Sequence, residues 1–144
     1  MAYCTQQDLI DRYGEAELIQ LTDRAGADAI DTTALARAIA DVDALVDGYL
    51  DARYSVPLSP VPGLIVRLAC MLTRAELYRD QVLEDSHPVV RDKAEATRVL
   101  MALSRGDVSL GLPEGGTPEP DSAGPSVSTN TPDRVFDSTS LDGF

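Results

Sequence analysis

The sequence has few of the residues on which enzymatic chemistry depends. Its 144 residues include no tryptophan, two phenylalanines, two cysteines and a single histidine. No serine lies in a nucleophile-elbow motif, and no glycine-rich segment matches the phosphate-binding or dinucleotide-binding patterns. Because catalysis needs positioned groups with matched pKa values, we expect no enzymatic activity, no cofactor and no metal ion.

The few groups that resemble sites have simpler structural interpretations. His87 stands directly before Pro88 at the start of a predicted helix, so we interpret it as a loop residue or a helix cap. Asp43 and Asp47 lie one helical turn apart, with Asp41 nearby, but no histidine or cysteine joins them as a ligand. We therefore interpret these three acids as the solvated face of a helix.

Long apolar runs and paired cysteines are also missing. No run of eighteen apolar residues occurs, so no membrane span is predicted. The first five residues carry no base and no apolar stretch follows them, which predicts a protein without a secretory signal that stays in the cytoplasm unless it is packed into a particle. Cys4 and Cys70 lie outside any CxxC pattern. We expect Cys70 to be a small buried hydrophobe and expect no disulfide.

Positive charge is scarce, because 12 basic residues face 24 acidic ones and the net charge is −12. A chain this acidic repels phosphate, which disfavours a DNA-binding regulator. The same charge suits the wall of a channel, since DNA must slide past such a wall without being held.

The composition changes near Leu112 and divides the chain into two parts. Residues 1–112 predict a helical body, and residues 113–144 predict an extended tail rich in Pro, Gly, Ser, Thr and Asp. The hydrophobic content of 44% suits one small soluble core. The predicted fold class is all-α, a small bundle of about five helices with a short C-terminal hairpin at 107–112 as an option and a long extended tail.

Apolar spacing and cap residues place the five helices at about 5–13, 15–21, 33–49, 62–84 and 88–104. Thr5 with Asp8 forms a capping-box pattern, and Gly14 and Gly106 are placed to end helices. The helix at 62–84 has the longest apolar stripe, which continues to Val82 and predicts the central, most buried helix. The inward residues expected for the last helix are Val90, Ala94, Thr97, Leu100 and Met101.

Two segments outside the helices have distinct chemistry. Residues 51–62 cannot stay helical, because Pro57, Pro60 and Pro62 remove three backbone donors, so we expect a defined extended connector. The end of the tail carries both phenylalanines and is typical of a peptide that docks on a partner, although packing onto its own body is the alternative. The docking residues are Arg134, Val135, Phe136, Leu141 and Phe144.

Three stretches together resemble a known family. They are the opening MAYCTQQDLIDRYG at 1–14, the segment DGYLDARYSVPL at 47–58 followed by a proline and a long helix, and the close with RVF at 134–136 and LDGF at 141–144. In this order and at this length they resemble the Mu-like prophage proteins of about 140 residues. The helical pattern is similar to that of phage head–tail connector proteins, also called adaptors.

The resemblance implies a structural part of a phage neck. Such adaptors form a ring, typically of twelve copies, beneath the portal protein, and a C-terminal extension reaches into the portal. It implies that the helices at 33–50 and 63–84 form the hub of each subunit and that the connector at 54–62 contacts the next subunit. The implied partners are the portal and a tail-side neck or tail-terminator protein, and the genome passes without specific binding. The candidates for the inter-subunit contact are Tyr49, Tyr54, Val56, Pro57 and Leu58.

Two other functions remain open at this point. A tail-completion or tail-terminator protein would lie on the other side of the same joint. An acidic regulatory protein, such as an anti-repressor or a DNA mimic, would fit the net charge of −12. The apolar end of the tail and the proline connector do not support the regulatory function.

Overall fold

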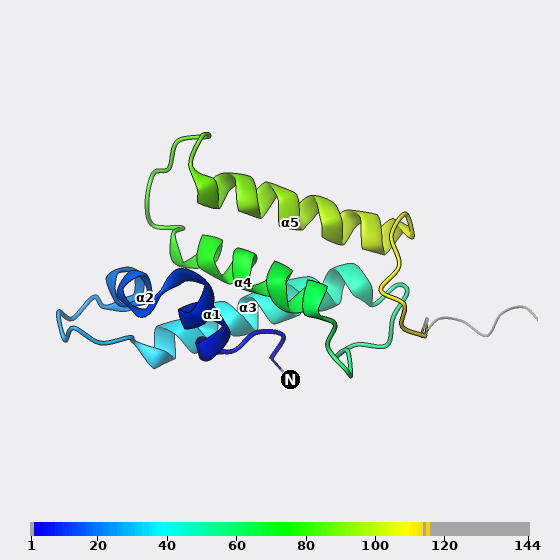
Figure 1. Ribbon diagram of the computed structural model, residues 1–144, viewed down its shortest axis with the longest axis horizontal. Helices are drawn as coiled ribbons and strands as arrows, with labels where there is room; N and C mark the ends of the chain where they lie inside the picture. The colour runs from blue at the N-terminus through cyan, green and yellow to red at the C-terminus, as the bar shows by residue number, and fades with distance from the viewer. Residues whose placement is uncertain (1, 114, 116–144) are drawn as a thin grey trace, which may run out of the picture.

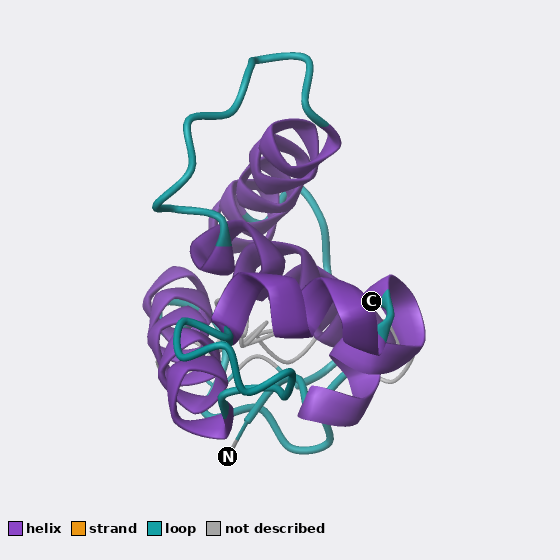
Figure 2. Ribbon diagram, turned by 90° about the vertical axis from the view of Figure 1, so that its left-hand side faces the viewer, coloured by secondary structure: helices purple, strands orange, loops and turns teal. Residues whose placement is uncertain are grey.

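The computed structural model describes residues 2–113 and residue 115. Across this described part the chain forms five helices and no strand, which confirms the predicted all-α class and the small bundle (Figures 1 and 2). The helices are α1 (Gln6–Tyr13), α2 (Glu15–Thr22), α3 (Thr32–Leu50), α4 (Gly63–Leu77) and α5 (Pro88–Arg105).

The N-terminal helices begin and end within one residue of the bounds that the sequence predicts. The Thr5 hydroxyl accepts the Asp8 backbone N–H at 3.2 Å, and Asp8 accepts the Thr5 N–H at 2.8 Å, which completes a capping box. Gly14 then separates α1 from α2 with a φ of 87°, a conformation that glycine adopts without a steric penalty.

Helix α4 lies in the middle of the bundle, where it contacts α1, α3 and α5 (Figure 1). This confirms it as the central helix, although it is shorter than the apolar stripe predicted. It ends at Leu77, where the Tyr78 N–H bonds to the Arg74 and Glu76 carbonyl oxygens and the chain then makes turns. Val82, which was expected in the stripe, is 105% exposed. The buried residues of α4 are Ile65, Leu68, Ala69, Cys70, Met71, Leu72, Thr73 and Ala75.

Helix α5 buries Leu100 as expected, but the face that it turns to the core is shifted from the one expected. Ala94 is exposed and Met101 is 41% exposed, whereas Ala96 and Leu103 are fully buried. The sequence carries apolar residues on both sides of the helix, so two faces about one position apart fit the same periodicity. Packing against α4 and α3 selects the face made by Val89, Ala96, Leu100 and Leu103.

The hairpin considered for residues 107–112 does not form, and this segment is a series of turns and bends. The Leu110 N–H donates to the Tyr54 hydroxyl instead of to a strand, and Gly111 takes a φ of 69°. Leu110 and Leu112 pack against the helical core. A hairpin needs a second strand to pair with, and the alternation of apolar residues here serves packing instead.

Candidate interaction surfaces

The proline-rich connector at 51–62 is held firmly at one end of the bundle, where α3 ends and both α4 and the segment after α5 begin (Figure 1). Two of its side chains are buried, with Tyr54 1% and Leu58 2% exposed. The bonds before Pro57 and Pro60 are cis. The connector is not helical, as the sequence predicted, but it forms a series of turns and bends instead of an extended segment.

Tyr3 ties this connector to the N-terminus and to α3. Its backbone N–H donates to Asp43 at 2.9 Å, and its hydroxyl donates to Asp47. The same hydroxyl accepts the Leu58 N–H at 3.1 Å. One buried tyrosine therefore joins the N-terminal segment to α3 and to the connector, at residues 40 to 55 positions away.

The electrostatics of this cluster keep the hydroxyl protonated. Burial and the hydrogen bond to Asp47 raise the pKa of Tyr3 to about 12, because both disfavour the phenolate. Burial also raises the pKa of Asp43, since a carboxylate loses solvation beside the N-terminal segment. The neutral phenol is thus fixed as the donor to Asp47 well beyond neutral pH.

A second tyrosine links the connector to the segment that leads toward the tail. The Tyr54 hydroxyl accepts the Leu110 N–H at 3.1 Å. The neighbouring Arg53 donates to the Leu103 carbonyl oxygen at 3.2 Å. The connector and residues 107–113 therefore form a single surface at this end of the bundle, which we call the connector end.

Some of the predicted inter-subunit contact residues are buried in the core, and others lie on the surface. Tyr54 and Leu58 are buried in their own subunit and offer almost no surface to another chain. Tyr49 and Val56 are half-buried, and Pro57 is exposed. Their role in a contact between subunits stays a prediction. The predicted docking residues Arg134, Val135, Phe136, Leu141 and Phe144 lie outside the described residues.

Comparison with known proteins gives the chain its family. The model of the family described as "Bacteriophage Mu, Gp36" matches residues 3–129, which include nearly all of the described helices and loops. The chain belongs to the bacteriophage Mu Gp36 family. The resemblance to Mu-like prophage proteins that the sequence suggested is therefore confirmed.

Two relatives of this Gp36-family chain place it among phage proteins. The "Mu-like prophage FluMu protein gp36" of Haemophilus influenzae is 29% identical over 110 residues, which are 76% of each chain. "Gene product J" of Escherichia phage Mu is 39% identical over 93 residues, which are 64% of this chain and 66% of that protein. Among the described helices, none is both long and apolar enough to cross a membrane.

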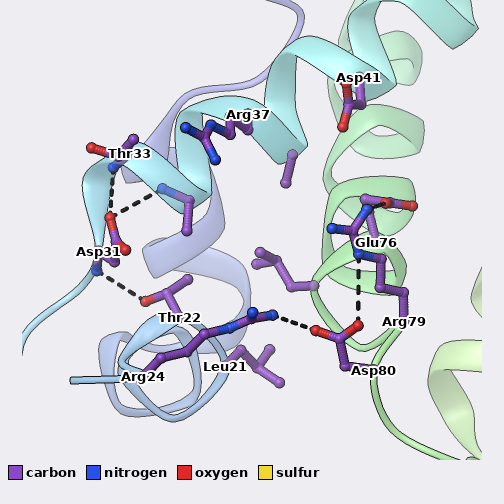
Figure 3. Close-up of a pocket in the computed structure, with 13 residues that line it drawn as sticks. Leu21, Thr22, Arg24, Asp31, Thr33, Arg37, Asp41, Glu76, Arg79 and Asp80 are labelled. Carbon is purple, nitrogen blue, oxygen red and sulfur yellow. Dashed lines mark hydrogen bonds and ion pairs between the residues drawn. The ribbon is translucent and has the colours of Figure 1, made fainter. Parts of the chain in front are cut away.

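The Gp36-family body also has a cleft at the opposite end, between the loop that follows α2 and the end of α4 (Figure 3). Its volume is about 330 Å³. Most of its charged groups already have partners, since Arg24 pairs with Asp80 and Arg79 bonds to Glu76 at 2.9 Å. Asp31 accepts the Thr33 N–H at 2.9 Å and so caps α3. We interpret the cleft as a junction of capping and ion-pair interactions.

Sequence reasoning missed what two of the aspartates do. Asp43 and Asp47 were expected on a solvated face, but both are half-buried and hold Tyr3. Their partner lies 40 or more positions away, so no local pattern could reveal it. His87, in contrast, is confirmed as a helix cap, because its Nδ1 accepts the Val89 N–H at 3.2 Å.

A second cluster that the sequence did not predict surrounds Arg74 in α4. Its guanidinium lies 4.5 Å from the ring centre of Tyr13, and its Nε lies 2.7 Å from an oxygen of Glu17. The Tyr78 hydroxyl donates to the same Glu17 oxygen at 3.1 Å. This cation–π and ion-pair cluster attaches α1 and α2 to α4, and its use is structural.

Proposed function

We propose that this Gp36-family protein is a structural adaptor of the phage virion, which forms a ring beneath the portal and links it to the tail. The observation that carries the proposal is the connector end. There Tyr54 joins the connector at 51–62 to the segment at 107–113, so the rigid loop and the origin of the C-terminal tail share one surface. Membership in a phage protein family supports the same conclusion.

The mechanism in this proposal is noncovalent and needs no enzyme activity and no cofactor. The helical body supplies the ring, in twelve copies by analogy with similar adaptors. The tail docks Val135, Phe136, Leu141 and Phe144 on the portal or on a neighbouring adaptor. Ordering a tail costs conformational entropy, and the many copies in a ring offset that cost by raising the effective concentration of each tail.

The charge of the chain supports a place in the neck, where the genome must pass. With a net charge of −12, the ring would present a wall that repels DNA phosphates. We infer that DNA moves through the ring without specific binding, and that the tail-side face contacts a neck or tail-terminator protein.

The test is portal binding by the full chain. A variant with Phe136→Asp and Phe144→Asp should lose co-purification with the portal, because two apolar anchors become charged. Val82→Asp is the matched control, since Val82 is fully exposed in a loop of the body, and it should bind as the unchanged chain does. Equal binding by the tail variant would reject the docking role.

A second test uses whole particles. Deleting the protein should leave heads and tails unjoined, and the protein should be present in purified virions. Joined particles after deletion would overturn the adaptor function. Co-purification with the tail tube and not with the portal would indicate a tail-completion protein, and binding to a host DNA-binding protein would indicate the regulatory function.

A further inference from the structure

Helix α5 carries a row of arginines along its exposed side. Arg91, Arg98 and Arg105 recur every seven residues, with Ala94 and Met101 between them. Steps of three and four residues place all five on one helical face. All five are exposed, and we call them the basic stripe. The stripe lies on the side of α5 opposite the buried residues Val89, Ala96, Leu100 and Leu103.

The basic stripe has no partner within the described residues. The structure gives Arg91, Arg98 and Arg105 neither an ion pair nor a hydrogen bond in residues 2–113 and 115, although the chain has twice as many acids as bases. Arg67 and Arg74, which also lie near α5, are both paired with acids. Arginine and methionine are enriched at protein interfaces, so the composition of the stripe is that of a contact surface.

Beyond Arg37, the outer face of α3 has the opposite charge. Asp41 and Asp51 are exposed, and no base occurs from residue 38 to residue 52. On the same face the exposed residues Ala40, Ala44 and Gly48 have small side chains, so another helix can approach closely. Four aspartates lie in this stretch, namely Asp41, Asp43, Asp47 and Asp51.

We propose that the basic stripe of α5 docks on the acidic outer face of α3 in a second copy of this chain. Both helices bury their opposite sides in the same core, so the two faces are separate surfaces of one subunit. Contact between two different surfaces leaves each pair with one open face of each kind, which leads to a ring or a filament and not to a closed dimer. Only the closure into a ring rests on the proposed adaptor function.

Charge favours a second copy over DNA as the occupant of the stripe. The net charge of −12 repels a duplex, whereas the acidic face of α3 attracts the stripe. The contact is exposed and ionic, so we expect salt to weaken it.

The experiment uses the full chain in sedimentation velocity over a range of concentrations and salt. The first variant reverses the stripe with Arg91→Glu and Arg98→Glu, and the second reverses α3 with Asp41→Arg and Asp51→Arg. The control, Arg12→Glu with Lys93→Glu, makes the same change in net charge as the first variant, at exposed positions outside the stripe. Circular dichroism checks that all variants keep their helices.

We expect each reversal to weaken self-association roughly a hundredfold and the control to leave it unchanged. Mixing the two reversed variants should restore association, because the unchanged stripe of one meets the unchanged α3 of the other, and the acidic reversed stripe meets the basic reversed α3. The mixture should therefore associate although neither variant does so alone, which no general effect of charge would produce.

Three results would overturn the contact: a mixture that does not associate, a control that loses association equally, or an unchanged chain that stays monomeric at every concentration. Arginine-dependent binding to a DNA duplex without self-association would also overturn it. If the contact fails while the protein still co-purifies with the portal, the adaptor function stands. If the variants associate as expected but portal binding is absent, the contact stands and the adaptor function fails.

Discussion

Two loops of similar length join the three long helices, and they are held in different ways. The connector at 51–62 buries Tyr54 and Leu58, donates its Leu58 N–H to the Tyr3 hydroxyl and accepts the Leu110 N–H at the Tyr54 hydroxyl. The loop at 78–87 leaves Val82 fully exposed and stands away from the helices (Figures 1 and 2). Apart from the exposed Arg24–Asp80 ion pair, the hydrogen bonds of residues 79–86 in the described part join near neighbours.

The comparison shows what makes a loop rigid in this protein. The prolines of the connector prevent a helix, but the connector is fixed by its buried side chains, by the Tyr3 hydroxyl that accepts the Leu58 N–H, and by its own Tyr54 hydroxyl, which accepts the Leu110 N–H. The loop at 78–87 has no proline before Pro88 and also lacks buried anchors. Each prediction below removes one anchor from the connector and compares it with a matched position.

The largest effect is expected from truncating the buried anchor of the connector. Leu58→Ala should lower the free energy of unfolding by about 3 kcal/mol, because it removes a packed side chain and leaves a cavity. Val82→Ala makes a similar truncation in the exposed loop and should change it by less than about 0.5 kcal/mol. Urea denaturation of both variants measures the difference. Equal losses would mean that the two loops contribute alike to stability.

The next effect is expected from removing a single hydroxyl. Tyr3→Phe should cost about 2 kcal/mol, because the half-buried Asp47 carboxylate and the Leu58 N–H both lose a partner. Tyr49→Phe is the control, since the Tyr49 hydroxyl makes no hydrogen bond within the described residues, and it should stay within about 0.5 kcal/mol. Thermal denaturation measures the difference, and equal melting temperatures of the two variants would contradict the prediction.

The smallest effect is a dependence of stability on alkaline pH. The pKa of Tyr3 is raised to about 12 in the folded protein, so the folded state keeps a proton that the unfolded state loses above about pH 10. This contribution to stability is present below pH 10 and is lost as the pH rises through 12. At pH 11 the loss should be about 1 kcal/mol.

The measurement for this prediction is the difference between the unchanged chain and Tyr3→Phe in denaturation between pH 9 and pH 12. Phenylalanine does not titrate, so the gap between the two proteins should narrow as the pH rises. A constant gap would show that Tyr3 titrates alike in the folded and unfolded states.

The helices were largely predictable, because the signals that begin and end them are local. The capping box of Thr5 and Asp8, the cap of α5 at His87 and the stop at Gly106 each depend on residues within one helical turn. The central position of α4 followed from its apolar stripe. These features could be read from short windows of sequence without knowledge of the fold.

The anchors of the connector could not be predicted, because they depend on contacts between distant segments. Nothing near Tyr3 in the sequence points to Asp47 or Leu58, which are 44 and 55 positions away. The predicted inward face of α5 was wrong in part for a related reason. Its apolar residues allow two faces, and only packing against α3 and α4 decides between them. Long-range geometry, not local propensity, set both of these errors.

The hydrogen bond from Leu110 to Tyr54 has a mechanical consequence. A pull on the chain beyond residue 113 reaches Leu110 before it reaches the last turn of α5. Tyr54 is fully buried just after the end of α3, so the load is transferred to that helix. The final turn of α5 is then protected from unravelling. The Leu110–Tyr54 hydrogen bond therefore diverts a load applied to residues 107–113 away from the last turn of α5.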